Sequence, residues 1–302
     1  MLALQASRLE IPFMSDHLRG LLLTTLGVLF VIPDALFVRL IGAEPMVTAF
    51  WRGLTAGSVV LIAVLAIWGL DGFRAVYRAG WPAMLYTVLL ATTAPAFVLA
   101  VENTSVANVV FIFACMPIFA AIFSRVFLGE AIQRRMVLTM VAVLIGLGVI
   151  AYGSTSTAIA SWKGDIWALY VTIAFSAALT AVRRVKEVSM VPAIPIAYIG
   201  AAIGVGLFTS PFEAFVPQWH LFLGHGAFIG AASCLLALGP RFISSTEVAL
   251  LVLLESVLAP ILVWMVIGEH PGQWALAGGV IVIGALLVSN LYALLSARRE
   301  PS

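Results

Sequence analysis

Charged side chains are scarce in this sequence. Only 10% of its 302 residues are Asp, Glu, Lys or Arg, whereas 63% are hydrophobic and the mean hydropathy is +1.12. A soluble globular domain carries about 25% charged residues, so this chain cannot cover a surface that faces water. The composition excludes an ordinary soluble protein and indicates that the solvent is a lipid bilayer.

Other absences exclude several classes of function. The sequence holds two cysteines, Cys115 and Cys234, and both lie in apolar stretches, which favours packing over a disulfide or a metal site. A net charge of +2 without a basic stripe argues against a nucleic-acid partner. There is no P-loop, so ATP does not drive the protein directly. His225 and Ser233 share one apolar stretch but form no known catalytic motif, and we predict no enzyme activity, metal or cofactor.

Long hydrophobic runs fill the rest of the chain. About 20 apolar residues in a helix cross the hydrocarbon core of a bilayer. Separating the runs at polar, proline or glycine breaks predicts an all-α membrane protein with ten transmembrane helices. Their expected limits are 19–41, 46–70, 81–101, 104–128, 134–153, 164–185, 193–212, 219–240, 243–267 and 272–295.

The second half of the sequence repeats the first. Each half holds five predicted helices, an odd number, so the second copy must enter the membrane in the opposite sense. We therefore expect two inverted repeats, over 19–153 and 164–295, between a cytoplasmic segment 1–18 and a cytoplasmic tail 296–302. Inverted repeats in an apolar chain are typical of secondary transporters. The clearest matches place Ser105 on Ser244, Gly129-Glu130 on Gly268-Glu269, and Gly53-x-x-x-Gly57 on Gly200-x-x-x-Gly204.

The basic residues predict the orientation. With ten helices and a cytoplasmic N-terminus, all but three of the 16 Lys and Arg residues fall on the cytoplasmic side. The exceptions are Arg39, Arg52 and Lys163. An excess of Lys and Arg marks cytoplasmic loops, so we expect a multi-pass protein with both termini in the cytoplasm.

Short motifs in register resemble one known family. They are Pro45 with Trp51-Arg52, Thr104-Ser105-x-Ala107-Asn108, Met116-Pro117 followed by Gly129-Glu130, Gly164-Asp165, and Leu254-Glu255 followed by Gly268-Glu269. In these residues the chain resembles the drug/metabolite transporter superfamily, EamA type. Within it, the chain is most similar to bacterial exporters of amino acids and metabolites.

The resemblance implies ten helices around a central cavity, location in the bacterial inner membrane, and export of amino acids or similar small polar metabolites. One departure concerns the ninth span. Ser256 stands where the first repeat has Pro117, so a proline break is not implied there, although Pro260 lies one turn later.

Two carboxyl groups inside predicted spans are the leading candidates for substrate binding. Glu255 lies near the middle of the ninth span with no basic residue within one helical turn. Burial disfavours its charged form, so it could accept a proton or bind a substrate ammonium group; a packing role is the alternative. Asp34 follows Pro33, where we expect a kink. Its partner could be Arg52, which could instead anchor the membrane interface.

Four further residues complete the predicted substrate site. Asn108, one turn into the fourth span, could line a mouth of the cavity or serve in capping and packing. Tyr86, Trp167 and Tyr170 lie deeper than the tryptophans at the span ends. Trp167 and Tyr170 belong to a helical stripe that could frame a cavity or form a packing groove.

These features predict a secondary transporter that exports amino acids or similar small polar metabolites by alternating access through a central cavity. Its partners would be the substrate, the lipid bilayer and, as a candidate for coupling, protons. An uncoupled facilitator and an exporter of drugs or cationic compounds are the alternatives. Substrate identity, direction and oligomeric state stay open.

Overall fold

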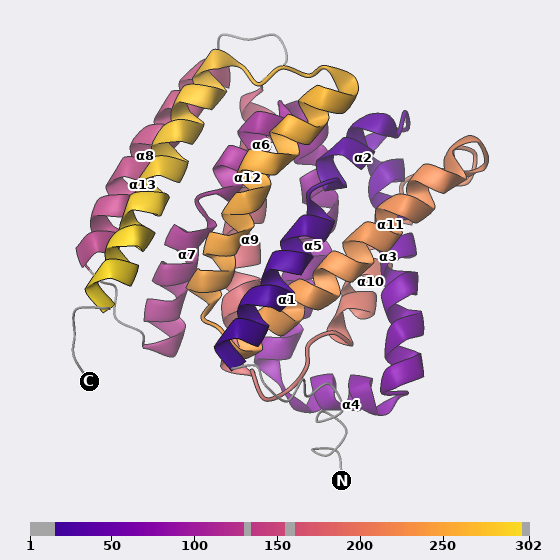
Figure 1. The fold of residues 1–302 in the computed structure, drawn as a ribbon. Coiled ribbons are helices and arrows are strands. Elements are labelled where there is room, and N and C mark those ends of the chain that lie inside the picture. The colour runs from indigo at the N-terminus through magenta and orange to yellow at the C-terminus, as the bar shows by residue number, and fades with distance from the viewer. Residues whose placement is uncertain (1–15, 130–133, 155–160, 298–302) are drawn as a thin grey trace.

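The computed structural model describes residues 16–129, 134–154 and 161–297, and all regular elements within these ranges are helices (Figure 1). The elements are α1 (Asp16–Val31), α2 (Asp34–Leu40), α3 (Pro45–Ile67), α4 (Asp71–Arg78), α5 (Trp81–Asn103), α6 (Val106–Phe113), α7 (Met116–Phe123), a π-helical turn (Ser124–Leu128), α8 (Arg134–Ser154), α9 (Trp162–Arg184), α10 (Ala193–Gly206), α11 (Phe215–Leu238), a 3₁₀ turn (Gly239–Arg241), α12 (Ser245–Ile267) and α13 (Gln273–Ala297).

Seven apolar stretches among the described residues are long enough to cross a membrane, as expected of a multi-pass membrane protein. Three shorter apolar helices, Val137–Gly153, Ala193–Gly206 and Gln273–Ala285, coincide with the fifth, seventh and tenth predicted spans. The helical order therefore follows the sequence prediction, while the count of ten crossings stays a prediction.

Proline explains two breaks within the predicted spans. Pro33 separates α1 from α2, which confirms the expected kink, and Pro117 stands in the first turn of α7, just after the break that ends α6. Proline lacks a backbone N–H and its ring crowds the preceding turn. In contrast, α12 continues through Pro260, so the ninth span has no break there. Ser256, at the position of Pro117, instead donates its hydroxyl to the carbonyl of Val110 at 2.7 Å.

The helix ends confirm the repeat in the backbone itself. The hydroxyls of Ser105 and Ser244 each accept the N–H of the residue three positions on, and so cap α6 and α12. At the other ends, Gly129 has φ 74° and ψ 10° and Gly268 has φ 72° and ψ 12°. Residues with a Cβ rarely adopt this left-handed conformation, which explains why both copies end in glycine.

Helix packing also repeats when the two halves are exchanged. Helix α5 of the first half packs against α9 of the second half, and its counterpart α11 of the second half packs against α1 of the first. The second spans of the halves, α3 and α10, pack together, and so do the fifth spans, α8 and α13, which form one side of the molecule (Figure 1). The two repeats therefore share one interface rather than forming separate bodies.

The direction of the second half follows from contacts at Thr104. The carbonyl of Thr104 accepts a bond from Arg39, at the end of α2, and its hydroxyl donates to Asp165, in the first turn of α9. The second half therefore begins at the end of the bundle where the first span finishes. This is the arrangement that an inverted repeat predicts.

Only one of the two Gly-x-x-x-Gly motifs makes a close helix contact. A Cβ at Gly53 would lie 2.8 Å from the carbonyl oxygen of Tyr198, and one at Gly57 would lie 2.7 Å from Ile199. Glycine thus lets α3 approach α10 closely. Gly200 and Gly204 have nothing from the described residues within 4 Å of such a Cβ, so the second motif does not return the contact.

Candidate functional site

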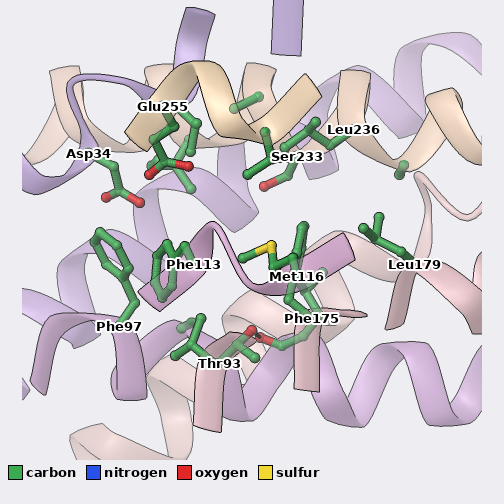
Figure 2. A pocket seen from close by; sticks show the side chains of 18 of the residues that line it. Asp34, Thr93, Phe97, Phe113, Met116, Phe175, Leu179, Ser233, Leu236 and Glu255 are labelled. Carbon is green, nitrogen blue, oxygen red and sulfur yellow. Dashed lines mark hydrogen bonds between the residues drawn. The ribbon is translucent and has the colours of Figure 1, made fainter. Parts of the chain in front are cut away.

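A cavity lies between the two halves of the bundle (Figure 2). Its empty space, part of which is open at the surface, is about 820 Å³. Every span except those of α8 and α13 contributes to its lining. Most lining residues are apolar or aromatic, such as Phe113, Met116 and Phe175, and three are charged. A mostly apolar concavity with a few converging polar groups is the usual form of a small-molecule site.

Asp34 and Arg52 form a buried ion pair at this cavity. The break at Pro33 makes Asp34 the first residue of α2, and Arg52 lies in the third turn of α3. Arg52 Nη2 lies 2.6 Å from Asp34 Oδ2, and Arg52 Nε lies 3.0 Å from Asp34 Oδ1. Their exposed fractions are only 2% and 6%. The two-point pairing fixes the geometry of both groups and balances their charges.

His225 of α11 is the second partner of Asp34. Its Nε2 lies 2.5 Å from Asp34 Oδ1, and its ring stacks on Phe37. The side chain is fully buried, and its Nδ1 has no hydrogen-bond partner among the described residues. Burying an N–H without an acceptor is costly. These contacts therefore assign the proton to Nε2, which donates it to Asp34, and describe a neutral imidazole.

Glu255 is the charged residue of the lining without a protein partner. It lies in α12 with 5% of its surface exposed, and its carboxyl group forms no hydrogen bond or ion pair within the described part of the chain. Figure 2 shows this group beside the carboxyl group of Asp34 on one side of the cavity. An unpaired carboxyl group in the middle of a membrane helix is costly unless it is protonated or meets a ligand.

Arg52 also faces the cavity. Its Nε and Nη2 bond Asp34, whereas Nη1 forms no hydrogen bond to another described residue. The guanidinium carbon lies 5.1 Å from the centre of the Phe97 ring, a distance that suits a cation–π contact. Arg52 is therefore held by Asp34 and by the ring of Phe97, and its Nη1 has no hydrogen bond from the described residues.

Two tyrosines also belong to the polar lining. Tyr86 of α5, a predicted site residue, is buried and lines the cavity. Tyr198 of α10 lines it too, and its hydroxyl lies 2.7 Å from that of Ser233, another lining residue. Of the six predicted site residues, the structure thus brings Glu255, Asp34 and Tyr86 to one cavity.

The other three predicted site residues lie outside this lining. Asn108 is buried near the start of α9, where its Nδ2 lies 3.3 Å from Thr104 Oγ1 and 3.2 Å from Asp165 Oδ1. This matches the packing alternative. Trp167 and Tyr170 are exposed.

The expected stripe of α9 and its cavity face are different. Tyr170 donates its hydroxyl to Thr92 at 2.7 Å, and its ring meets that of Trp167 edge-on. The cavity face of α9 carries Val171, Phe175, Leu179 and Val182 instead. Trp167 and Tyr170 thus lie part of a turn away from the residues of α9 that line the cavity.

Sequence reasoning missed His225 and undervalued Arg52 and Tyr198. A histidine within an apolar span signals a buried polar partner. Ser, Thr and His residues occur by chance in apolar spans, so one histidine there did not stand out as a site residue.

A second ion pair lies at the end of the bundle where α9 begins. Arg39 Nε lies 2.9 Å from Glu269 Oε2, and the N–H of Val106, at the start of α6, donates to Glu269 Oε1 at 2.9 Å. Glu269 therefore has a structural role in tying α2, α6 and the end of α12 together. Its repeat counterpart, Glu130, lies outside the described residues.

One known protein family matches this sequence in both halves. The model of the EamA-like transporter family matches residues 18–152 and 162–291, one match to each half. The chain belongs to the EamA-like transporter family. It is therefore a membrane transporter of small molecules within the drug/metabolite transporter superfamily, and members of the family are transporters rather than enzymes.

The fold of this EamA-like transporter also occurs among solved structures, of which 28 chains match. One of them, titled only "Crystal structure of protein", has 18% sequence identity and a TM-score of 0.67, and the match covers 93% of this chain and 99% of that chain. At this identity the likeness shows the fold alone. No curated protein matches the sequence.

Proposed function

We propose that this EamA-like transporter exports amino acids or similar small polar metabolites that carry an amino group, by alternating access through the central cavity. The observation that carries the proposal is the Glu255 carboxyl group, which lines the cavity and forms no hydrogen bond or ion pair with another described residue. A protonated amine is the complementary ligand, because it donates hydrogen bonds and neutralises the buried charge.

The rest of the site would orient such a substrate. Arg52 Nη1 is a donor for a carboxylate or carbonyl oxygen, and Tyr86 supplies a hydroxyl. The apolar lining around Phe113 and Met116 would accept a side chain. Asp34 then acts mainly through Arg52, whose position it fixes. Asn108, Trp167 and Tyr170 have no contact role in this proposal.

The direction rests on ten crossings, two inverted repeats and cytoplasmic termini in an inner membrane. In that topology Arg183 lies on the cytoplasmic side. The cavity lining extends to Val182 beside it, whereas the Arg39–Glu269 pair joins helices at the opposite end. A cavity that reaches toward the cytoplasm can load a substrate from inside the cell, which is the first step that export requires.

Proteoliposome counterflow with a panel of labelled amino acids tests the proposal. Wild type would be compared with Glu255→Gln, and with Glu102→Gln as a matched control, since Glu102 lies in α5 but outside the cavity lining. Runs with and without an imposed pH gradient test proton coupling.

We expect transport by wild type and Glu102→Gln and loss of transport in Glu255→Gln. A transport rate that changes neither with the pH gradient nor in Glu255→Gln would contradict the role of Glu255 and favour an uncoupled facilitator. A folded protein that moves no amine-bearing compound would overturn the substrate class.

A further inference from the structure

We propose that this carrier exchanges one proton for one singly charged amine, so that no net charge crosses the membrane in a full cycle. This inference rests on the proposed function and names its preferred substrate: an amine with an apolar body and no free carboxylate. Zwitterionic amino acids would then be the poorer substrates of the same site.

The inference starts from the charges around the cavity. Asp34 and Arg52 compensate each other through a two-point ion pair. His225 adds no charge, because its Nδ1 has no partner and its Nε2 proton is donated to Asp34. One carboxyl group, that of Glu255, is left without a partner among the described residues. Whenever Glu255 is ionised, the side chains of the cavity therefore carry one negative charge that no positive charge balances.

No other ionisable group among the residues that line the cavity changes this count. The charged groups that act on it are Asp34 of α2 and Arg52 of α3. Two tyrosines, Tyr86 of α5 and Tyr198 of α10, are the other ionisable side chains of the lining, and both are neutral near pH 7. The lining residues from α1, α6, α7, α9 and α11 carry no ionisable side chain.

Charge neutrality then selects two states of the cavity. An isolated buried charge is strongly unfavourable, so the empty carrier crosses between its two open states with Glu255 protonated. The loaded carrier crosses with Glu255 ionised and the ammonium group of the substrate beside it. The proton leaves Glu255 on the side where the amine binds, and another proton joins Glu255 where the amine departs. Each cycle therefore moves one positive charge in each direction.

A zwitterion is a poorer substrate for this exchange. Its ammonium group could contact Glu255 and its carboxylate could contact Nη1 of Arg52. The substrate and the charged side chains of the cavity would then together carry one unbalanced negative charge. Protonation of Glu255 would restore neutrality only by removing the charge that attracts the ammonium group. Arg52 offers hydrogen bonds to a carboxylate but no free charge, because Asp34 already uses it.

The experiment compares two labelled probes that differ in one group, L-leucine and 3-methylbutylamine, which is leucine without its carboxylate. Initial rates of uptake into proteoliposomes would be measured with a pH gradient alone and with a potassium diffusion potential of either sign alone. Protein-free liposomes report passive leakage of the neutral amine, which is subtracted. Glu255→Gln removes the carboxyl group that exchanges the proton. Glu255→Asp, which retains a carboxyl group, is the second variant and is used if Glu255→Gln does not fold.

We expect the amine to move at least about tenfold faster than leucine, to follow the pH gradient, and to ignore the membrane potential. Glu255→Asp should keep this pattern at a lower rate. Amine flux driven by the potential would overturn the one-for-one exchange, and leucine flux equal to amine flux would overturn the preference. Either result leaves a working amine exporter, whereas a folded protein that moves neither probe would overturn the proposed function as well.

Discussion

The buried Asp34–Arg52 pair makes the most informative stability prediction. Arg52→Gln would leave the Asp34 carboxylate, which is 2% exposed, with His225 as its one remaining partner. Removing one member of a buried ion pair costs about 3–5 kcal/mol, because the other charge stays buried and uncompensated. The loss should be at the upper end of this range, since two hydrogen bonds, of 2.6 and 3.0 Å, disappear together.

A double-mutant cycle separates the pair from the individual side chains. Asp34→Asn, Arg52→Gln and the double variant would be unfolded by titration with sodium dodecyl sulfate in mixed micelles, with tryptophan fluorescence as the signal. The double variant should be more stable than the sum of the single losses predicts, because it leaves no uncompensated charge. The exposed pair Arg74–Asp71 is the control, and Arg74→Gln should cost about 0.5 kcal/mol or less.

Two results would refute this reasoning. One is a loss in Arg52→Gln no larger than that in Arg74→Gln, which would mean that water or lipid headgroups compensate the Asp34 charge. The other is strict additivity in the cycle, which would mean that the two side chains do not interact in the folded protein.

The remaining predictions concern the scaffold and use the same unfolding assay. Gly57→Val should destabilise by about 1–3 kcal/mol through overpacking, because a Cβ there lies 2.7 Å from Ile199, whereas Gly204→Val, with open space, is the matched control. Equal losses would contradict the close α3–α10 contact. Gly268→Ala should cost about 1 kcal/mol because its φ is 72°, and an unchanged midpoint would show that the turn relaxes. Ser244→Ala should cost about 1 kcal/mol by removing the cap of α12; no loss would mean that water replaces the hydroxyl.

The helical character of the scaffold could be predicted from the sequence, whereas the count of ten crossings stays a prediction. Long apolar runs mark helices in lipid because every backbone polar group must be bonded within its own segment, and Pro33 marked the break between α1 and α2. The repeat could be recognised because both copies need the same capping residues. Each has a serine such as Ser105 where the span begins and a glycine such as Gly129 where it ends. Local chemistry determines these features, so local patterns predict them.

The site was only partly predictable because it depends on which helix faces which. Glu255 stood out as a lone carboxyl group in an apolar span. The partners of Asp34 come from α3 and α11, and one of them, His225, lies 191 positions after Asp34 in the chain. For Trp167, rotation of α9 by part of a turn decides between the cavity and the exposed surface. Packing of the whole bundle sets that rotation, and no local pattern records it.

The repeat also explains why the chemistry is concentrated in few residues. The offset that aligns Ser105 with Ser244 places Met116 on Glu255, and both side chains line the cavity. The offset that aligns Trp51 with Tyr198 places Arg52 on Ile199. The two halves thus share a symmetric scaffold, as two inverted copies need for exchanging conformations, but not its charges. Asp34 is paired with Arg52, so Glu255 is the carboxyl group that carries one proton or one ammonium group at a time, and a second such group at Met116 would change that number. Met116→Glu should therefore alter the stoichiometry of exchange, so that amine uptake responds to the membrane potential that the wild-type protein ignores.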